Sequence, residues 1–554
     1  MAYDNYYIAD QFTLLSKLMD INGENSFKSK SYSIAAFNIE KLEIQLYLAE
    51  RADIAALKGI GDSSAKKIVE ILDSGKLGIL EELLAKTPAG VAEMLNIKGL
   101  GPKKIATVWK EMGIETIGEL IYACNENRLT LYKGFGEKTQ KNVQEAIEFY
   151  TRSQGNYLFA QVEEHTNKIT DSLVKAFPAQ QTSIAGSFRR QLEIITSLQW
   201  VTTIDAKSLT TFFESIGYKI ASESSSLLSF SGPENILLEF ILADNSSFST
   251  VLFDNSCSEE FFEAFKEQMA GKQYQVAETE EELFERAGLQ FVPVPLREKK
   301  ETITKALNNE IPELIRTSDI KGLVHSHSTW SDGSDSIETM AKAAISMGLE
   351  YLVISDHSKS AFYANGLQED RLIKQHEEID ALNRKLAPFK IFKSIESDIL
   401  NDGSLDYPDE VLARFDLVIA SVHSNLKMTI EKAMSRVLTA IANPYTTILG
   451  HPSGRLLLSR PGYPLDYPAV IEACAKHKVA IELNAHPRRL DLDWRWIDMA
   501  IANNVLISID PDSHAADAFG DIKYGVLAAQ KAGVSAKHNL SSYSLKEFEE
   551  FIKK

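Results

Sequence analysis

The chain has 554 residues, with 59 Lys and Arg against 77 Asp and Glu, and a formal net charge of −18 at pH 7. At about 100–200 residues per domain, this length predicts three to five domains. The composition, 44% hydrophobic and 25% charged, is globular and excludes a disordered, fibrous or disulfide-stapled chain. No apolar run approaches the ~18 residues of a membrane span, and the first 30 residues do not resemble a signal peptide. Together with three widely spaced cysteines, this predicts a cytoplasmic protein that does not engage a membrane.

Residues 1–150 show helical apolar spacing with little strand-like alternation. Three Gly-x-Gly turns interrupt them, each between an apolar helix end and a helix carrying Lys: Gly59 and Gly61, Gly99 and Gly101 before Lys103, and Gly134 and Gly136 before Lys138. Glycine lets N–H groups at a helix N-terminus approach a phosphate, and such contacts do not read base sequence. One such turn could be an ordinary helix cap, but three alike predict sequence-independent DNA binding.

Residues 156–300 mix helical spacing with short alternating runs such as SLLSFSG and ILLEFILAD. This texture predicts an α+β region with an antiparallel sheet. The following stretch, residues 301–319, is charged and polar, and we expect it to be a linker between domains.

Residues 320–554 alternate buried apolar runs with helices, which predicts a (β/α) barrel of seven strands. The runs are GLVH, YLVIS, KIFKSI, DLVIAS, TTILG, VAIELN and VLISID. Each leads into a polar or metal-capable residue. Because the carboxyl ends of barrel strands converge on one mouth, these side chains are expected to meet there.

Nine residues at this mouth are candidate metal ligands: His325, His327, Asp332, His357, Glu396, His423, His451, Asp512 and His514. Nine ligands exceed one tetrahedral site and suit two or three divalent ions, with Glu396 bridging a pair. Imidazole and carboxylate without thiolate favour Zn, Mn or Fe. Such a centre activates water and holds a phosphoester. For a single histidine, a structural role is the better interpretation, but nine residues recurring at the same strand ends favour metal.

The segments HSHSTWSDGSDSIE, ISDHS, ESDILNDGSLDYPDEVL, DLVIASVHS, ILGHPSGRLL, RRLDL and DPDSH resemble the PHP (polymerase and histidinol-phosphatase) domain at the C-terminus of bacterial family-X DNA polymerases. The resemblance covers essentially all of residues 318–554 and fills all nine ligand positions. It implies a distorted (β/α)7 barrel, a trinuclear metal centre and 3′–5′ exonuclease or related phosphoesterase activity, with His325, His327, Glu396 and Asp512 as catalytic ligands. Arg455, near His451, either contacts a substrate phosphate or forms a salt bridge at the rim.

The helical region resembles the lyase-like (1–90) and fingers-like (91–155) helix-hairpin-helix subdomains of the same family. Lys67 matches the position of that family's Schiff-base lysine in the 5′-deoxyribose-phosphate lyase site. A Schiff base requires a neutral amine, and a plain phosphate contact is the favoured alternative for Lys67.

The segment AGSFRR, with Gly186, Ser187 and Arg190, resembles the phosphate-contacting start of the family-X palm, a nucleotidyltransferase-like α+β domain. We assign 156–245 to the palm and 246–300 to the thumb. The positions of the family's two metal-binding aspartates hold Ser197 and Gln199, and Glu239 is nearest to the third. Neither Ser197 nor Gln199 offers the anionic oxygen that Mg²⁺ prefers, so we expect the polymerase activity to be lost.

The leading hypothesis is therefore a DNA-repair phosphodiesterase that acts on gapped DNA or 3′ ends, with protein partners unknown. One alternative is an active gap-filling polymerase with PHP proofreading, which Ser197 and Gln199 oppose. A second is a small-molecule phosphatase of the histidinol-phosphatase type, which the three glycine turns oppose. A third is a non-catalytic DNA-end-binding module, which the full ligand set opposes.

Overall fold

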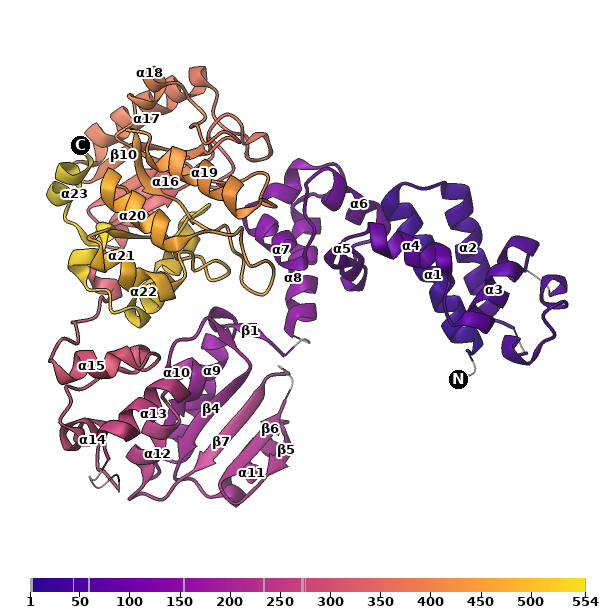
Figure 1. Ribbon diagram of the computed structural model, residues 1–554, viewed down its shortest axis with the longest axis horizontal. Helices are drawn as coiled ribbons and strands as arrows, with labels where there is room; N and C mark the ends of the chain where they lie inside the picture. Colours follow the sequence, from indigo (N-terminus) through magenta and orange to yellow (C-terminus); the bar gives the residue numbers. More distant parts are fainter. Residues whose placement is uncertain are drawn as a thin grey trace. The chain divides into compact units, whose positions relative to one another are not determined.

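The structure is a computed structural model that describes residues 3–42, 44–57, 60–152, 155–232, 235–270, 274 and 276–553. It divides into two compact units, Met1–Tyr150 and Thr151–Lys554 (Figure 1). Within the described ranges, no helix has the length and apolar character needed to cross a membrane.

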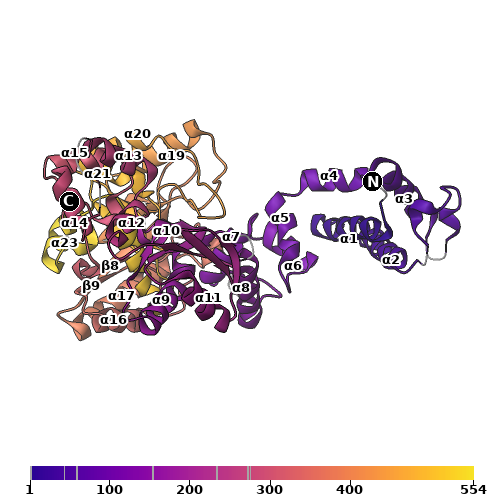
Figure 2. The ribbon, with the colours of Figure 1, turned by 90° about the horizontal axis from the view of Figure 1, so that it is seen from below.

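The first unit is helical, as predicted. Its helices are α1 (Asn5–Asn22), α2 (Ser26–Glu40), α3 (Asp62–Ser74), α4 (Gly78–Lys86), α5 (Ala89–Glu93), α6 (Pro102–Lys110), α7 (Ile117–Asn125) and α8 (Glu137–Arg152). The long helices α1 and α2 pack side by side (Figure 2). One apolar core runs through the unit, with Phe12 and Ile68 fully buried in it.

The second unit begins with a five-stranded sheet in the order β2-β4-β7-β6-β5. The strands are β2 (Thr182–Ala185), β4 (Ser197–Thr202), β5 (Lys219–Glu223), β6 (Leu227–Ser231) and β7 (Leu237–Leu242). A two-residue ladder of β1 (Tyr157–Leu158) and β3 (Ile194–Ile195) lies beside it. An antiparallel sheet was expected, and three of its four strand pairs are antiparallel. The central pair β4 and β7 is parallel, so the sheet is mixed. Short apolar runs in the sequence predict where the strands lie, but they do not predict which strands pair with one another.

Side-chain alternation along β4 separates the two faces of this sheet. Leu198 and Trp200 are fully buried with α9 (Phe159–Ala176) and α11 (Ala206–Ser215) on one face. The opposite face packs against α12 (Phe248–Asp254) and the single turn α10 (Gly186–Arg189). The palm candidates Ser197 and Gln199 belong to this second face.

Three helices form the next core: α13 (Glu259–Gln268), α14 (Glu280–Ala287) and α15 (Glu301–Leu307). The stretch 301–319, expected to be a linker, thus begins with the helix α15. Ile303 and Ala306, three residues apart on α15, are buried against the thumb-like core. The sequence does not reveal this packing, because the short apolar stripe lies among charged residues in a helix of only seven residues.

All seven predicted barrel strands are present and parallel, in the order β14-β13-β12-β11-β10-β9-β8. They are β8 (Gly322–Ser326), β9 (Tyr351–Ile354), β10 (Lys390–Asp398), β11 (Leu417–Ser421), β12 (Thr446–Leu449), β13 (Ala480–Asn484) and β14 (Ile507–Asp510). A bridge between Ser326 and Ser513 joins the two ends of the sheet, so the barrel is nearly closed.

Helices cover the outside of the barrel (Figure 1). They are α16 (Ile337–Ser346), α17 (Glu369–Leu386), α18 (Asp409–Leu412), α19 (Ile430–Ile441), α20 (Tyr467–His477), α21 (Ile497–Ala502), α22 (Ile522–Lys531) and α23 (Leu545–Ile552). Phe548 of α23 stacks on Tyr351 at the start of β9, with ring centroids 4.5 Å apart. The amino-terminal end of the barrel is thus plugged by apolar side chains, and the polar groups collect at the opposite end.

Candidate metal centre

Glu396, near the end of β10, stands at the centre of the site. Its carboxylate is 1% exposed and faces five imidazoles. Oε1 lies 2.9 Å from His451 Nε2, 3.0 Å from His423 Nε2 and 3.3 Å from His325 Nε2. Oε2 lies 3.0 Å from His357 Nδ1 and 3.6 Å from His327 Nε2. A carboxylate so surrounded fits the bridging role predicted for it.

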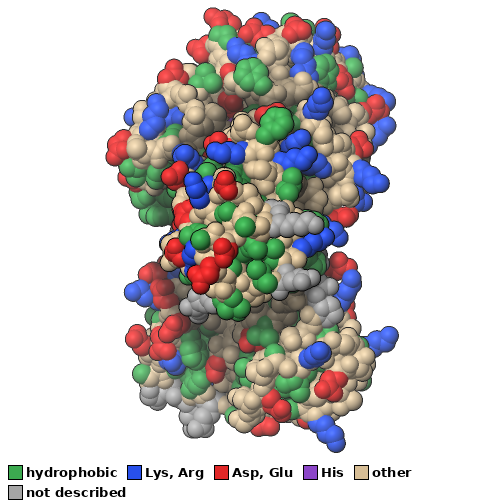
Figure 3. Space-filling model, turned by 90° about the vertical axis from the view of Figure 1, so that its right-hand side faces the viewer, with side chains coloured by type: hydrophobic (Ala, Val, Ile, Leu, Met, Phe, Trp, Pro, Cys, Tyr) green, Lys and Arg blue, Asp and Glu red, His purple; other side chains and the backbone are tan. Residues whose placement is uncertain are grey.

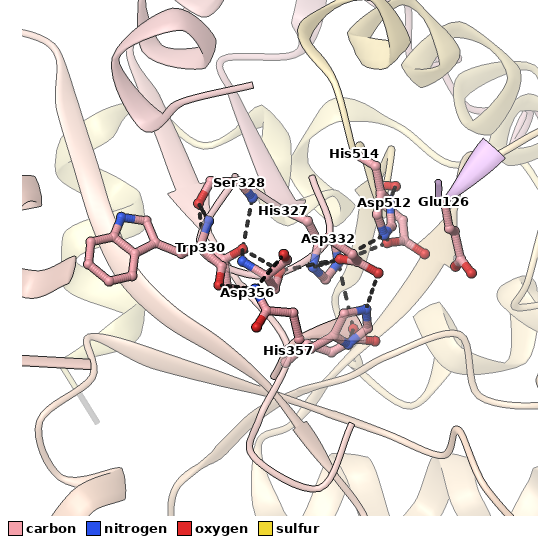
Figure 4. A network of polar contacts seen from close by, with 12 residues as sticks. Glu126, His327, Ser328, Trp330, Asp332, Asp356, His357, Asp512 and His514 are labelled. Atoms are coloured by element: carbon pink, nitrogen blue, oxygen red, sulfur yellow. Dashed lines mark hydrogen bonds and ion pairs between the residues drawn. The ribbon is translucent and has the colours of Figure 1, made fainter. Parts of the chain in front are cut away.

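Two aspartates extend the cluster to either side. Asp512 Oδ1 is 3.1 Å from His327 Nε2 and 3.6 Å from His325 Nε2. Asp332 lies 3.5 Å from His514 Nε2 and 3.6 Å from His357 Nε2 (Figure 4). All nine predicted ligands therefore meet in one place. Eight of them form three groups with metal-binding spacing: His327, Asp332, His357 and His514; His325, His327 and Asp512; and His357, Glu396 and His423.

The backbone at the site is held in unusual conformations. His325, His451 and Asp512 have positive φ angles of 61°, 22° and 52°. Non-glycine residues seldom adopt this region, and such strain tends to collect at functional sites. The strain turns these side chains toward the centre from the ends of three different strands.

The donor set fits divalent metal ions. His327 Nδ1, His325 Nε2 and Asp332 Oδ2 are buried without a hydrogen bond among the described residues. Buried polar atoms are normally paired, so this group of unpaired buried donor atoms fits a set of metal ligands. Imidazole and carboxylate donors suit Zn, Mn or Fe.

The charges of the site are strongly coupled. Burial alone would raise the pKa of Glu396, but His423, His325 and His357 hold the pKa of this carboxyl well below its usual range. Burial lowers the pKa of His423, yet Glu396 and Asp398 outweigh it and raise the pKa to about 10. Burial and the neighbouring His514 and His357 lower the pKa of His327 to about 3. The neighbouring imidazoles therefore favour the ionised form of the central carboxylate, Glu396.

A second layer of residues, which the sequence did not reveal, orients these ligands. Glu482 Oε2 lies 2.7 Å from His325 Nδ1, and Asp398 Oδ1 lies 2.5 Å from His423 Nδ1. Each carboxylate holds one ring nitrogen so that the other faces the centre. The sequence offers one signal for Asp398. It follows Glu396 by two residues on β10, so both side chains lie on the same face of the strand.

Asp356 performs a similar task for the turn that carries Asp332 (Figure 4). Its buried carboxylate accepts hydrogen bonds from the backbone and hydroxyl groups of Ser328 and Ser331 and from the Gln375 amide. Burial raises the pKa of Asp356 to about 6, although these hydrogen bonds oppose the rise. Asp332 is therefore presented by a rigid turn.

Arg455 lies at the rim of the barrel mouth, and its guanidinium nitrogens interact with other groups of the protein. Nε donates to the Arg489 carbonyl at 2.9 Å, another nitrogen bonds Asp493, and a third approaches Glu193 at 3.5 Å. These contacts support the salt-bridge alternative over a substrate contact.

In the first unit, the predicted glycine turns precede α3, α6 and α8. Gly61 and Gly101 are the N-caps of α3 and α6, and Gly136 directly precedes α8. Gly99 and Gly134 have φ of 86° and 94°, and a Cβ on either would meet open space. Gly59 lies outside the described residues. Lysine and arginine are interspersed with acidic residues on the face drawn in Figure 3, where no histidine is visible among the coloured residues.

The lyase candidate Lys67 is half-buried on α3. Its Nζ lies 5.5 Å from the centre of the Tyr32 ring. An aromatic face stabilises a cation, whereas a Schiff base requires the neutral amine. This contact supports the phosphate-binding alternative for Lys67.

The palm candidates form a closed hydrogen-bonded group. Glu239 Oε2 accepts from Ser197 Oγ at 2.7 Å and from Gln199 Nε2 at 2.9 Å. Gln199 also fills the space beside Gly186, where a Cβ would come within 2.0 Å of its Oε1. Arg190 pairs with Glu298 at 3.1 Å, and Glu298 also binds the buried Lys531 of the barrel at 2.9 Å. The three palm positions thus contain one carboxylate, Glu239, which already accepts hydrogen bonds from the neutral side chains of Ser197 and Gln199.

Three family models match parts of the chain. Residues 4–77 match the helix-hairpin-helix domain, 91–148 the SAM-like helix-hairpin-helix tandem and 324–486 the PHP domain. The chain is 34% identical to the DNA polymerase/3′-5′ exonuclease PolX of Bacillus subtilis, over 97% of each chain. Probable phosphatases are similar over a smaller part. One from Acetivibrio thermocellus is 32% identical over 29% of this chain and 64% of its own length, and YcdX of Escherichia coli is 32% identical over 24% and 56%.

The fold and the site together define a PHP-barrel hydrolase of the metal-dependent type, joined to a family-X polymerase scaffold with helix-hairpin-helix motifs. The similarity over nearly the whole of both chains is more specific. The chain belongs to the PolX family.

Proposed function

We propose that this protein is a DNA-repair phosphodiesterase that removes nucleotides from 3′ ends at gaps, with two or three Zn, Mn or Fe ions in the barrel mouth. The observation that carries the proposal is the convergence of five imidazoles on Glu396, flanked by Asp332 and Asp512. Metal ions in such a site lower the pKa of bound water and neutralise charge on a phosphoester.

The chain's own residues account for the rest of the site. Glu482 and Asp398 fix the ring orientation of His325 and His423, and Asp356 fixes the turn of Asp332. The first unit would hold the DNA backbone without reading sequence, through N–H groups at the starts of α3, α6 and α8. The three cysteines lie far apart in the sequence, which suits a reducing cytoplasm.

Polymerisation is not part of the proposed function, although the Bacillus subtilis relative is named a DNA polymerase. The hydrogen-bonded group of Ser197, Gln199 and Glu239 supports this restriction, since it contains one carboxylate where two-metal phosphoryl transfer uses several. The small-molecule phosphatase alternative is less supported, because the probable phosphatases lack a counterpart for most of this chain.

The test is a nuclease assay on gapped DNA with Mn²⁺, Zn²⁺ or Fe²⁺ supplied to chelator-treated protein. The double variant His325→Ala/His327→Ala should lose bound metal and activity. His477→Ala, an exposed histidine in the last turn of α20, is the matched control and should retain both. Full activity of the double variant would exclude the barrel as the active site.

A further inference from the structure

A short loop at the barrel mouth presents an aromatic side chain to solvent. It follows the candidate ligand His357 and contains the single turn η7 (Phe362–Ala364). Phe362 is 84% exposed, more than any other large hydrophobic side chain described within 151–554. An isolated exposed apolar residue is common and needs no explanation by itself. The loop around Phe362, however, is rigid and adjoins the site.

Several contacts close this loop. A bridge joins Ser358 to Leu367, and the Leu367 amide donates to the His357 carbonyl at 2.9 Å. Gly366 packs so tightly that a Cβ there would lie 1.9 Å from the Ser358 carbonyl oxygen. Asn365 Nδ2 donates to the Ser331 carbonyl at 3.2 Å, which ties the loop to the turn that carries Asp332.

The direction of each side chain follows from the three-residue period of the turn. Ala361 and Ala364, three residues apart, are both fully buried and anchor the loop. The ring of Tyr363 faces the His357 ring, with centroids 6.3 Å apart. Phe362 is the residue of the turn whose side chain projects into solvent. The next residue, Tyr363, contacts the candidate ligand His357.

Two basic side chains lie near the exposed ring of Phe362. Lys359, two residues after His357, lies over the buried Tyr407 ring at 5.2 Å and pairs with Glu369 at 3.6 Å. Arg371 donates to the Asn365 carbonyl at 2.8 Å. Basic side chains beside exposed aromatic rings are typical of surfaces that bind single-stranded nucleic acid, where bases stack on the rings.

We propose that Phe362 stacks on the base of the nucleotide at the 3′ end and so positions the adjoining phosphodiester over the metal centre. This inference rests on the proposed function and deepens it, because it assigns a substrate-positioning residue. A phosphodiester at a duplex end reaches a recessed site only if its terminal nucleotide is splayed out, and an aromatic platform replaces the base stacking that the nucleotide gives up. Every base has a π face, so stacking on Phe362 would be sequence-tolerant.

The test compares wild type, Phe362→Ala and Phe362→Tyr in the full-length, metal-loaded protein. Single-stranded DNA with an ordinary 3′ nucleotide is one substrate, and the same strand with an abasic 3′ residue is the other. Phe362→Ala should raise KM for the ordinary strand by about 5- to 100-fold and leave KM for the abasic strand unchanged. Phe362→Tyr should behave as wild type. Met347→Ala, 48% exposed just before the amino-terminal end of β9, is the matched control and should change neither.

A binding measurement adds a readout independent of hydrolysis. A strand ending in 2-aminopurine, mixed with chelator-treated protein, should lose fluorescence through stacking with wild type and Phe362→Tyr but not with Phe362→Ala. Equal KM and equal quenching for wild type and Phe362→Ala would overturn the inference while leaving the nuclease intact. If wild type hydrolyses neither strand, the proposed function itself fails.

Discussion

The Nδ1 atom of His325 lies 2.7 Å from Oε2 of Glu482, and both side chains are completely buried inside the barrel. Glu482 also accepts a hydrogen bond from Asn484, whose amide reaches Asp512. One carboxylate on β13 therefore orients a histidine on β8 and, through an amide, an aspartate after β14. His325 and Asp512 are thus held in place by residues outside the set of nine candidate ligands.

The first prediction concerns Glu482. Replacing it with Gln keeps the volume but removes the charge that fixes the His325 ring, and loss of such a partner typically costs about 10–100-fold in metal affinity or activity. Glu482→Gln should weaken metal retention by about that factor, measured by competition with a chelator. Glu472→Gln, on the outer helix α20, is the control. Unchanged metal retention in Glu482→Gln would show that His325 needs no such support.

The second prediction concerns pH. Although burial lowers it, the pKa of His423 is raised to about 10 by Glu396 and Asp398, so the metal-free imidazole is protonated at pH 7. A metal ligand must be deprotonated. Proton and metal therefore compete throughout the range below about pH 10, and apparent metal affinity should rise as pH increases. Titration calorimetry with Mn²⁺ in two buffers of different ionisation enthalpy should show net proton release.

The matched variant for that measurement is His423→Asn, which has no proton to lose. It should release about one proton fewer per chain than wild type. Metal uptake that releases no proton in wild type, or an affinity independent of pH, would contradict the charge assignment at His423.

The third prediction concerns the glycine turns. Gly99 has φ of 86° and space around it, so a side chain there meets backbone strain rather than a clash. A β-branched residue tolerates positive φ poorly, whereas Asn tolerates it well. Gly99→Val should weaken DNA binding by full-length protein in chelator, equally for all sequences. The slope of log affinity against log salt should become shallower by about one for each phosphate that the variant no longer neutralises. Gly99→Asn should be affected less, and equal binding by Gly99→Val and wild type would remove this turn from the DNA interface.

The sequence predicted the ligands and missed their supports for a physical reason. His325, Glu396 and Asp512 can be recognised as candidate ligands from the sequence because each ends or follows an apolar run. The carboxyl ends of parallel barrel strands converge, so such residues are expected to meet. Glu482 sits within the run VAIELN, where its inward direction depends on the register of β13 against its neighbours. The parallel pairing of β4 with β7 and the exposure of Phe362 likewise arise from tertiary contacts between segments, which local periodicity does not record.

The last prediction is that the protein does not extend primers. Mg²⁺ beside a triphosphate prefers anionic oxygen ligands and gives up its waters reluctantly. Ser197 offers a hydroxyl and Gln199 an amide, and both donate to Glu239 instead of leaving it free. Loss of even one electrostatic group in a catalytic site typically costs ~10²–10³ in rate, and two groups acting on the same ions do not behave independently.

The measurement is extension of a primer across gapped DNA with Mg²⁺ or Mn²⁺, in the His325→Ala/His327→Ala background so that degradation cannot hide synthesis. The Bacillus subtilis relative, which is named a DNA polymerase/3′-5′ exonuclease, serves as the positive control. Template-directed extension by this protein would mean that another carboxylate reaches the palm metals, and the gap-filling polymerase alternative would then replace the function proposed here.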